Sequence, residues 1–283
     1  SWRGLCNARA TSEGHLSEVS GIGANRRQIL QDLGIAGIDD LAKSNPIDLR
    51  NNLERFGDQH GEIADHLVNQ AKAQLNDRTE RLDSTPALPE LGSAPGILLY
   101  DIESDPDARD DFLHGFVQVN RKKDGSWDLD NAKYHPILLL YEHGESLAWK
   151  RLKRKLSHYK NWPILHYGET EALVLSRLAK RQGATDIELE SLKSRLIDVH
   201  ARVRHHWYLP LNSYGLKTVA NWIGFKWDQV GVDGARALLW WRQWRGLGEK
   251  NRGNLNNLKW IFNYNCDDCL ATWAVAEWLL KES

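Results

Sequence analysis

The chain has 283 residues, of which 41% are hydrophobic and 27% charged, and this composition predicts a globular protein with a buried core. No apolar stretch approaches the roughly 18 residues that span a bilayer, and three cysteines are too few for a disulfide framework, so we expect a cytoplasmic protein that does not enter a membrane. The net charge of −1 means that any binding of nucleic acid must depend on local basic patches.

The first part of the chain is expected to be an irregular lead-in followed by a small all-α domain. Residues 1–15 are small and polar and show no periodicity, whereas apolar residues recur at helical spacing over residues 16–75. Because the sequence contains no methionine, we expect it to be a fragment of a longer protein, with a processed product as the alternative.

Two short Gly-Ile turns interrupt this helical segment. In the first, Gly21 and Gly23 flank one apolar residue, which allows a tight hairpin with backbone amides exposed at a helix N-terminus, where they can bind a phosphate oxygen. Arg26 and Arg27 follow the turn and favour a phosphate ligand. The segment resembles the helix-hairpin-helix element of DNA-binding proteins, although a plain helical bundle with glycine turns fits the same pattern.

Residues 76–95 are rich in polar residues, proline and glycine, and predict a linker, after which residues 96–283 read as one α/β domain. Strands are expected at 96–104, 112–119 and 136–140 as an antiparallel meander. A helix at 145–158, a strand at 163–165, a helix through Glu171 and a fifth strand at 196–199 come next. The remainder is expected to be helical, with a Gly-rich interruption at 245–253. This order predicts a mixed five-stranded sheet flanked by helices.

The strand at 96–104 ends in two acids one residue apart, Asp101 and Glu103. Alternate residues of a strand share a face and lie roughly 6.6 Å apart at Cα, so both carboxylates point the same way. Oxygen ligands presented side by side suit Mg²⁺ or Mn²⁺. A strand end that meets a solvated acidic loop is the alternative, because further aspartates follow closely.

A second polar site follows the strand at 163–165. Glu171, in the first turn of the next helix, could face Asp101, because ligands in open α/β sheets sit at the carboxyl ends of strands. An acid in this position also complements the helix dipole, and His166 or Glu169 could be the functional residue instead.

A third site lies in the last helix, which is expected to run to about residue 280. Tyr264 and Asp268 are four residues apart and share a face, which places a phenol beside a carboxylate. Asp267 falls on a different face and is expected to point to solvent. Cys266 and Cys269 form a lone CxxC pair, which we interpret as small core-facing or lightly exposed residues rather than zinc ligands.

Two other stretches could contact nucleic acid. Lys150, Arg151 and Lys153 could track a phosphate backbone, although a solvated basic helix face has the same composition. Three tryptophans at 240–244 cluster beside Arg242 and Arg245, as in surfaces that stack single-stranded bases, but their spacing favours a role in the core.

With these motifs in this order, the sequence resembles the DEDD superfamily of 3′→5′ exonucleases, which have an RNase H-like fold. Asp101-Ile102-Glu103 is similar to the first motif and residues 166–171 to the second, with Glu171 where these enzymes usually carry Asp. Tyr264 through Asp268 matches the Tyr-x3-Asp motif of the DEDDy branch. The resemblance is closest to RNase H-like domains fused to bacterial RecB-type nucleases, which also follow a helix-hairpin-helix-like segment. Residues 1–6 resemble the tail of such an upstream nuclease domain, which we therefore expect to be absent from this fragment.

The resemblance implies a 3′→5′ exonuclease that hydrolyses nucleic acid, with DNA favoured over RNA. Two Mg²⁺ or Mn²⁺ ions would be held by Asp101, Glu103, Glu171 and Asp268, and Tyr264 would orient the attacking water. The residues expected to contact nucleic acid are Gly21, Gly23, Arg26, Arg27, Lys150, Arg151, Lys153 and His166. The alternative is a non-catalytic module that holds nucleic acid for an upstream RecB-type nuclease.

Overall fold

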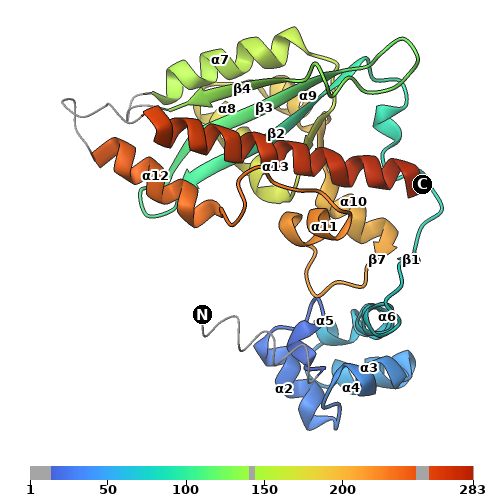
Figure 1. Cartoon of the computed structure of the whole chain (residues 1–283). Helices are drawn as coiled ribbons and strands as arrows, with labels where there is room; N and C mark the ends of the chain where they lie inside the picture. Colours follow the sequence, from blue (N-terminus) through green and yellow to red (C-terminus); the bar gives the residue numbers. More distant parts are fainter. Residues whose placement is uncertain (1–13, 140–143, 247–254, 283) are drawn as a thin grey trace. The chain divides into compact units, whose positions relative to one another are not determined.

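The computed structural model describes residues 14–139, 144–246 and 255–282 (Figure 1). Their contacts divide the chain into two compact units. The first contains the described residues up to Thr85 together with Val203–Val219, and the second contains Pro86–Arg202 and the described residues from Ala220 onward. The predicted lead-in, residues 1–15, lies almost wholly outside the described residues. Most of the predicted interruption at 245–253 lies outside them too.

The first unit contains the predicted helical region. Its helical elements are η1 (Leu16–Glu18), α2 (Ala24–Asp32), α3 (Ile38–Lys43), α4 (Pro46–Glu54), α5 (Asp58–Gly61) and α6 (Ala64–Leu75). Local sequence sets several boundaries: α4 begins where the Asn45 side chain accepts hydrogen bonds from two backbone amides and Pro46 fills the first helical position. Buried leucines, including Leu30, Leu41 and Leu67, form a core between these helices.

A short two-stranded ladder also belongs to this unit. β1 (Glu80–Arg81) lies inside the predicted linker and pairs antiparallel with β7 (Trp207–Tyr208). The sequence pattern did not predict β1, because two exposed polar residues carry no periodicity and the strand depends on a partner far along the chain. The same linker contains η2 (Pro89–Leu91).

The second unit is built on the predicted mixed five-stranded sheet, which is confirmed. Its strands are β2 (Gly96–Asp105), β3 (Asp110–Asn120), β4 (Lys133–Leu138), β5 (Ile164–His166) and β6 (Leu196–Asp198). They lie in the order β4-β3-β2-β5-β6, with β2, β3 and β4 antiparallel and with β5 and β6 parallel to β2.

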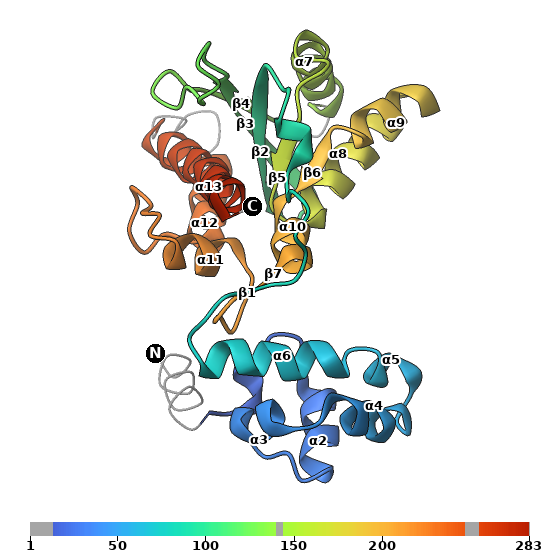
Figure 2. The same cartoon turned by 90° about the vertical axis from the view of Figure 1, so that its right-hand side faces the viewer.

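Helices cover both faces of this sheet, as Figure 2 shows. One face carries α7 (Glu145–His158), α8 (Glu169–Arg181) and α9 (Asp186–Lys193), and the other carries α12 (Gly234–Gly246) and α13 (Leu255–Glu282). The remaining helices are α10 (Val199–His206) and α11 (Leu216–Trp222). No helix in the described part of the chain is long and apolar enough to cross a bilayer.

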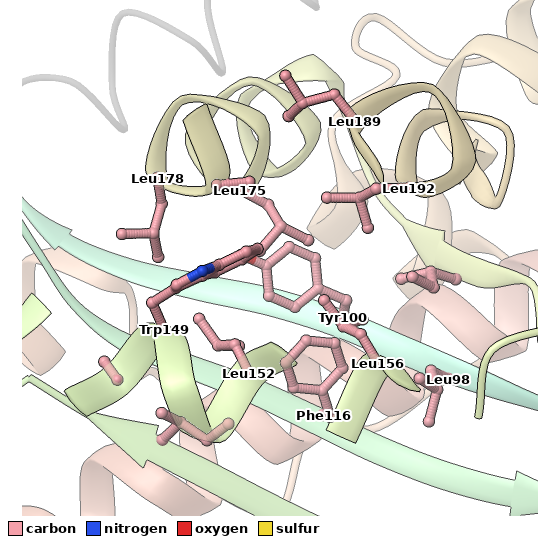
Figure 3. Close-up of a cluster of buried hydrophobic side chains, with 14 of the residues drawn as sticks. Leu98, Tyr100, Phe116, Trp149, Leu152, Leu156, Leu175, Leu178, Leu189 and Leu192 are labelled. Carbon is pink, nitrogen blue, oxygen red and sulfur yellow. The ribbon is translucent and has the colours of Figure 1, made fainter. Parts of the chain in front are cut away.

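The alternation of side chains along β2 lets one strand serve both faces. Leu98 and Tyr100 are fully buried and pack with Trp149 of α7 and Leu175 of α8 in the main core (Figure 3). Leu99 and Asp101 alternate with them and face the opposite side of the sheet. There Asp101 receives a hydrogen bond from α13.

The tryptophans of α12 pack largely as the sequence predicted. Trp241 is fully buried, and its ring stacks on Phe112 of β3 with ring centroids 4.3 Å apart. Trp240 and Trp244 are partly buried against the same cluster. The neighbouring Arg242 donates hydrogen bonds to the carboxylate of Asp105, which ties α12 to the end of β2.

Candidate active site

Three carboxylates from the first strand and the last helix of the second unit lie close together in the structure. Asp101 and Glu103 project from β2, Asp268 projects from α13, and one oxygen of each lies within 4.8 Å of the others. Glu103 and Asp268 are only 8% exposed, so the cluster is largely screened from bulk water. Buried carboxylates at such short separations are arranged as cation ligands are.

A glycine on the neighbouring strand allows α13 to approach the sheet this closely. Gly115 of β3 lies directly opposite Asp101 in the β2–β3 ladder. A Cβ atom at this position would lie 1.6 Å from Oδ1 of Asn265, far inside any permitted contact. The missing side chain therefore provides the space in which α13 presents its polar residues to β2.

Asn265 fixes the orientation of Asp101. Its Nδ2 donates to Oδ2 of Asp101 at 2.6 Å, and its own Oδ1 accepts a hydrogen bond from the Tyr134 hydroxyl of β4 at 2.9 Å. The amide is fully buried, so this chain of hydrogen bonds is protected from water. No local pattern singles out Asn265, because its role depends on a contact with a residue more than 160 positions away.

Asp268 is held in a similar way. The indole Nε1 of Trp227 donates to its Oδ1 at 2.7 Å, and the Tyr264 side chain, one helical turn earlier, is hydrogen-bonded to the same carboxylate. Trp227 comes from the segment between α11 and α12, and sequence reasoning missed it. The predicted pairing of Tyr264 with Asp268 on one face of the helix is present.

The electrostatics of the cluster favour a bound cation. Burial raises the pKa of Asp101 well above its ordinary value, and the negative charges of Glu103, Asp268 and Glu171 raise it further. Burial and the neighbouring Asp268 also raise the pKa of Tyr264, so its phenol stays protonated at neutral pH. A divalent cation among these oxygens would compensate the repulsion between the carboxylates.

Glu171 lies near this group but outside the set of three. α8 begins just after Gly168, whose φ of +105° favours glycine, and the Gly168 amide donates to Oδ1 of Asp198 at 2.9 Å. Burial raises the pKa of Glu171 to about 7, and Asp198 contributes to the increase. Oε2 of Glu171 is buried and has no hydrogen-bond partner among the described residues, so this oxygen is available to a ligand.

The two alternatives to Glu171 have different surroundings. Glu169 is exposed at the start of α8. His166 is 2% exposed, and its Nδ1 lies 2.6 Å from the Gly168 carbonyl oxygen, so the ring holds the turn between β5 and α8. Burial lowers the pKa of His166, which favours the neutral ring. The negative charge of Glu171, by contrast, raises the pKa of Asp101.

The predicted basic residues of α7 lie on its exposed face. Lys150 and Arg151 point outward, and Lys153 forms an ion pair of 2.8 Å with Glu188 of α9. Arg151 also lines a groove of about 490 Å³ between α7 and β4. The other residues of this groove are Tyr134, His135, Pro136, Ile137, Arg154, Lys155, His158 and Tyr159.

Both glycines of the predicted phosphate-binding turn in the first unit are exposed. Gly21 has a φ of +94°, and Gly23 caps the N-terminus of α2. The Arg26 guanidinium donates to the Gly21 carbonyl oxygen at 2.5 Å, and its burial lowers its pKa. Arg27 is half-buried. Arg26 therefore closes the turn in this structure.

One expectation for the last helix was wrong. Asp267 does not point to solvent: it is 8% exposed, and its Oδ2 accepts a hydrogen bond from the Asp228 amide at 3.0 Å. The segment that brings Trp227 to the site covers this face of α13, which helical periodicity cannot reveal. Cys269 is buried and Cys266 half-buried, both as free thiols, as the sequence predicted.

Comparison with known proteins places the chain in a family. The family model of the RNase H superfamily matches residues 98–280, a span that begins in β2 and ends in α13. This span contains Asp101, Glu103, Glu171 and Asp268. No curated protein and no solved structure matches the chain. Since the match covers more than half of the sequence and the chain forms the predicted mixed five-stranded sheet, the chain belongs to the RNase H superfamily.

Proposed function

We propose that this protein is a metal-dependent nuclease that hydrolyses phosphodiester bonds as a 3′→5′ exonuclease, with DNA as the preferred substrate. The observation that carries the proposal is the meeting of Asp101, Glu103 and Asp268 within 4.8 Å, with Tyr264 hydrogen-bonded to the last of them. The Tyr-x3-Asp spacing on α13 supports assignment to the DEDDy branch. We also propose that the chain is related to the RNase H-like domains that are fused to RecB-type nucleases.

The donor set fits Mg²⁺ or Mn²⁺. Asp101, Glu103 and Asp268 offer only oxygen ligands, which hard cations prefer, and Glu171 adds a buried oxygen without a partner among the described residues. We propose that these four residues hold two ions. When bound, such ions would neutralise charge on the non-bridging phosphate oxygens and make a water nucleophilic at neutral pH.

The other residues of the site position these groups. Asn265 and Trp227 hold the carboxylates of Asp101 and Asp268 through hydrogen bonds, so that the ligands need little reorganisation to bind a cation. Tyr264 keeps its proton, because its pKa is raised, and so cannot act as a general base at neutral pH. Its role is to orient a water molecule that donates a hydrogen bond to the phenolic oxygen.

Basic residues of α7 would guide the nucleic acid. The groove between α7 and β4 carries Arg151, Arg154 and Lys155 within one stretch, and such a row of positive charges suits a phosphate backbone. Lys150 and Lys153 extend the charge along the exposed face of the helix. In the first unit, the exposed turn at Gly21 and Gly23 would bind a backbone phosphate in the manner of a helix-hairpin-helix element.

The test is a digestion assay with single-stranded DNA and RNA oligonucleotides, labelled at either end, in the presence of Mn²⁺ or Mg²⁺. We expect mononucleotides to be released from a 3′-labelled strand and a ladder of shortened products from a 5′-labelled strand. Asp101→Asn should abolish both, whereas Asp130→Asn, an exposed aspartate, should leave activity unchanged. Full activity of Asp101→Asn would refute the proposal. Tight binding by the wild-type protein without any product would favour the non-catalytic module.

A further inference from the structure

A second group of potential metal ligands lies in the first unit, apart from the carboxylate cluster. Asp83, His205 and His206 each place one ligand atom within 4.8 Å of the others. Asp83 follows β1 closely, and the two histidines end α10 directly before β7. The β1–β7 ladder continues into this site, because the Leu82 amide donates to the His206 carbonyl oxygen at 2.8 Å. Backbone pairing therefore holds the three side chains together.

The three side chains are oriented toward one another. Oδ2 of Asp83 lies 3.1 Å from Nε2 of His205, while its Oδ1 accepts a hydrogen bond from the Thr85 amide at 2.8 Å, which fixes the plane of the carboxylate. The rings of His205 and His206 have centroids 4.9 Å apart. One carboxylate oxygen and two imidazoles thus converge from two chain segments that are more than 120 positions apart.

His206 supplies an independent observation. Its side chain is 3% exposed, and the buried Nδ1 has no hydrogen-bond partner among the described residues. A buried ring nitrogen without a partner is costly, and native proteins usually supply a partner or a ligand. A surface ion pair between Asp83 and His205 would explain those two residues but would leave the buried imidazole unexplained.

We infer that Asp83, His205 and His206 form a binding site for Zn²⁺. Imidazole nitrogens favour zinc and similar transition metals, whereas Mg²⁺ prefers oxygen ligands alone. Three protein ligands leave a fourth tetrahedral position for water, and His205, which is 67% exposed, keeps that position open to solvent. A bound ion would link the segment after β1 to the start of β7 and so stabilise the short ladder between them.

The experiment uses the full chain without an affinity tag, freed of metal by chelation, and titrated with Zn²⁺ by calorimetry. We expect one equivalent to bind in the wild type and in Asp101→Asn, so the result does not depend on the proposed nuclease site. Asp83→Asn and His205→Ala each replace one of the proposed ligands. Neither Asp83 nor His205 is fully buried, so both variants are expected to fold. Both should weaken the binding by more than about tenfold. Asp130→Asn is the matched control and should bind as the wild type does.

Two further measurements complete the test. Tetrahedral Co²⁺ absorbs visible light much more strongly than octahedral Co²⁺, so the wild type should give a strong band that Asp83→Asn loses and Asp101→Asn keeps. Hydrogen exchange of the amides of residues 80–83 and 205–208 should slow when Zn²⁺ is added. Absence of Zn²⁺ binding by the wild type, or binding by Asp83→Asn and His205→Ala that is as tight as that of the wild type, would overturn the inference.

Discussion

Asp101 is a carboxylate of the candidate active site that lies close to the charges of the other acids. Burial and three neighbouring acids raise its pKa, whereas the Asn265 amide donates to its Oδ2. Such a carboxylate is costly to ionise in the absence of metal and binds strongly to a divalent cation once ionised. The protein therefore holds these acids in place by packing and neutral hydrogen bonds, which is how a site remains formed before its ligand arrives.

Tyr264→Phe removes the hydroxyl group beside Asp268 and leaves the ring in place. If the phenol orients the attacking water, we expect metal-dependent hydrolysis to fall roughly 10²-fold. The affinity for Mn²⁺ should stay close to that of the wild type, because the phenol is not a proposed metal ligand. Single-turnover digestion and a Mn²⁺ titration separate the two effects. Tyr208→Phe, in the first unit, is the control, and an equal loss in both variants would argue against the proposed role.

Glu171→Gln should change the pH dependence of stability in the metal-free protein. The pKa of Glu171 is raised from 4.5 to about 7 in the folded state, so the folded state holds its proton more tightly than the unfolded state does. The stabilisation of the folded state by the protonated Glu171 is complete below pH 4.5 and is lost as the pH rises through 7. The neutral glutamine avoids that loss, so the variant should exceed the wild type in stability by about 3 kcal/mol at pH 8.

Urea unfolding at pH 4.5 and pH 8 measures this difference, which should nearly vanish at the lower pH. Glu169→Gln is the matched control, because Glu169 lies two residues earlier in the same helical turn and is exposed. It should change stability by only a few tenths of a kcal/mol at either pH, through its interaction with the helix dipole. A wild type as stable as Glu171→Gln at pH 8 would contradict the buried, unpartnered state of this carboxylate.

The acids of the candidate site could be selected from the sequence, whereas its neutral residues could not. Asp101, Glu103 and Asp268 stand out because acids at strand or helix spacing are unusual next to apolar runs. Asn265 and Trp227 act through hydrogen bonds to acids 164 and 41 positions away, and no local pattern encodes such distances. Asp267 was misassigned because periodicity defines a helix face but not what covers it.

The contact between α13 and the sheet is the structural element on which the site depends. β2 supplies two acids and α13 the third, so any shift of the helix changes the distances between all three. Gly115 sets how closely the two elements approach, and Cys269 of α13 lies against its carbonyl oxygen, with its Sγ 3.9 Å away. The geometry of the candidate site and the packing of α13 therefore depend on the same position of β3.

Gly115→Ala should damage stability and activity together. The added methyl group would collide with Oδ1 of Asn265, so either the asparagine leaves Asp101 or α13 moves outward. Overpacking of this kind typically costs about 1–3 kcal/mol, which urea unfolding can measure. Digestion assays should detect a parallel loss of activity. Gly234→Ala, at the start of α12 with nothing within 4 Å of the new Cβ, should be neutral. Wild-type activity in Gly115→Ala would show that the close approach is unnecessary.

The predictability of an element depended on how it is stabilised. The apolar run of β2 and the amphipathic repeat of α7 gave boundaries close to those observed, because each element buries a regular face. α9 has only two buried leucines in eight residues and was not predicted. β1 and β7 have two residues each, and they exist through pairing with each other. Elements that depend on distant partners are therefore the ones that a single sequence hides.

At the scale of the whole molecule, the two compact units carry ligand sets of different chemistry. The second unit contains the carboxylate cluster, whose oxygen ligands suit Mg²⁺ or Mn²⁺. The first unit contains Asp83 with two imidazoles, a set that suits Zn²⁺. The difference in ligand type allows each metal to be used as a probe of one unit in the presence of the other.

Hydrogen exchange measured peptide by peptide should distinguish the binding of Mg²⁺ to the second unit from the binding of Zn²⁺ to the first. A ligand present at 100 times its dissociation constant stabilises the folded state by about 2.7 kcal/mol, which corresponds to roughly 100-fold slower exchange through the affected opening. We expect Mg²⁺ to protect peptides from β2 and α13, and Zn²⁺ to protect peptides that contain β1 and β7. Asp101→Asn should lose only the protection by Mg²⁺, and Asp83→Asn only the protection by Zn²⁺. If either metal protected both sets of peptides equally, the assignment of one metal site to each unit would be wrong.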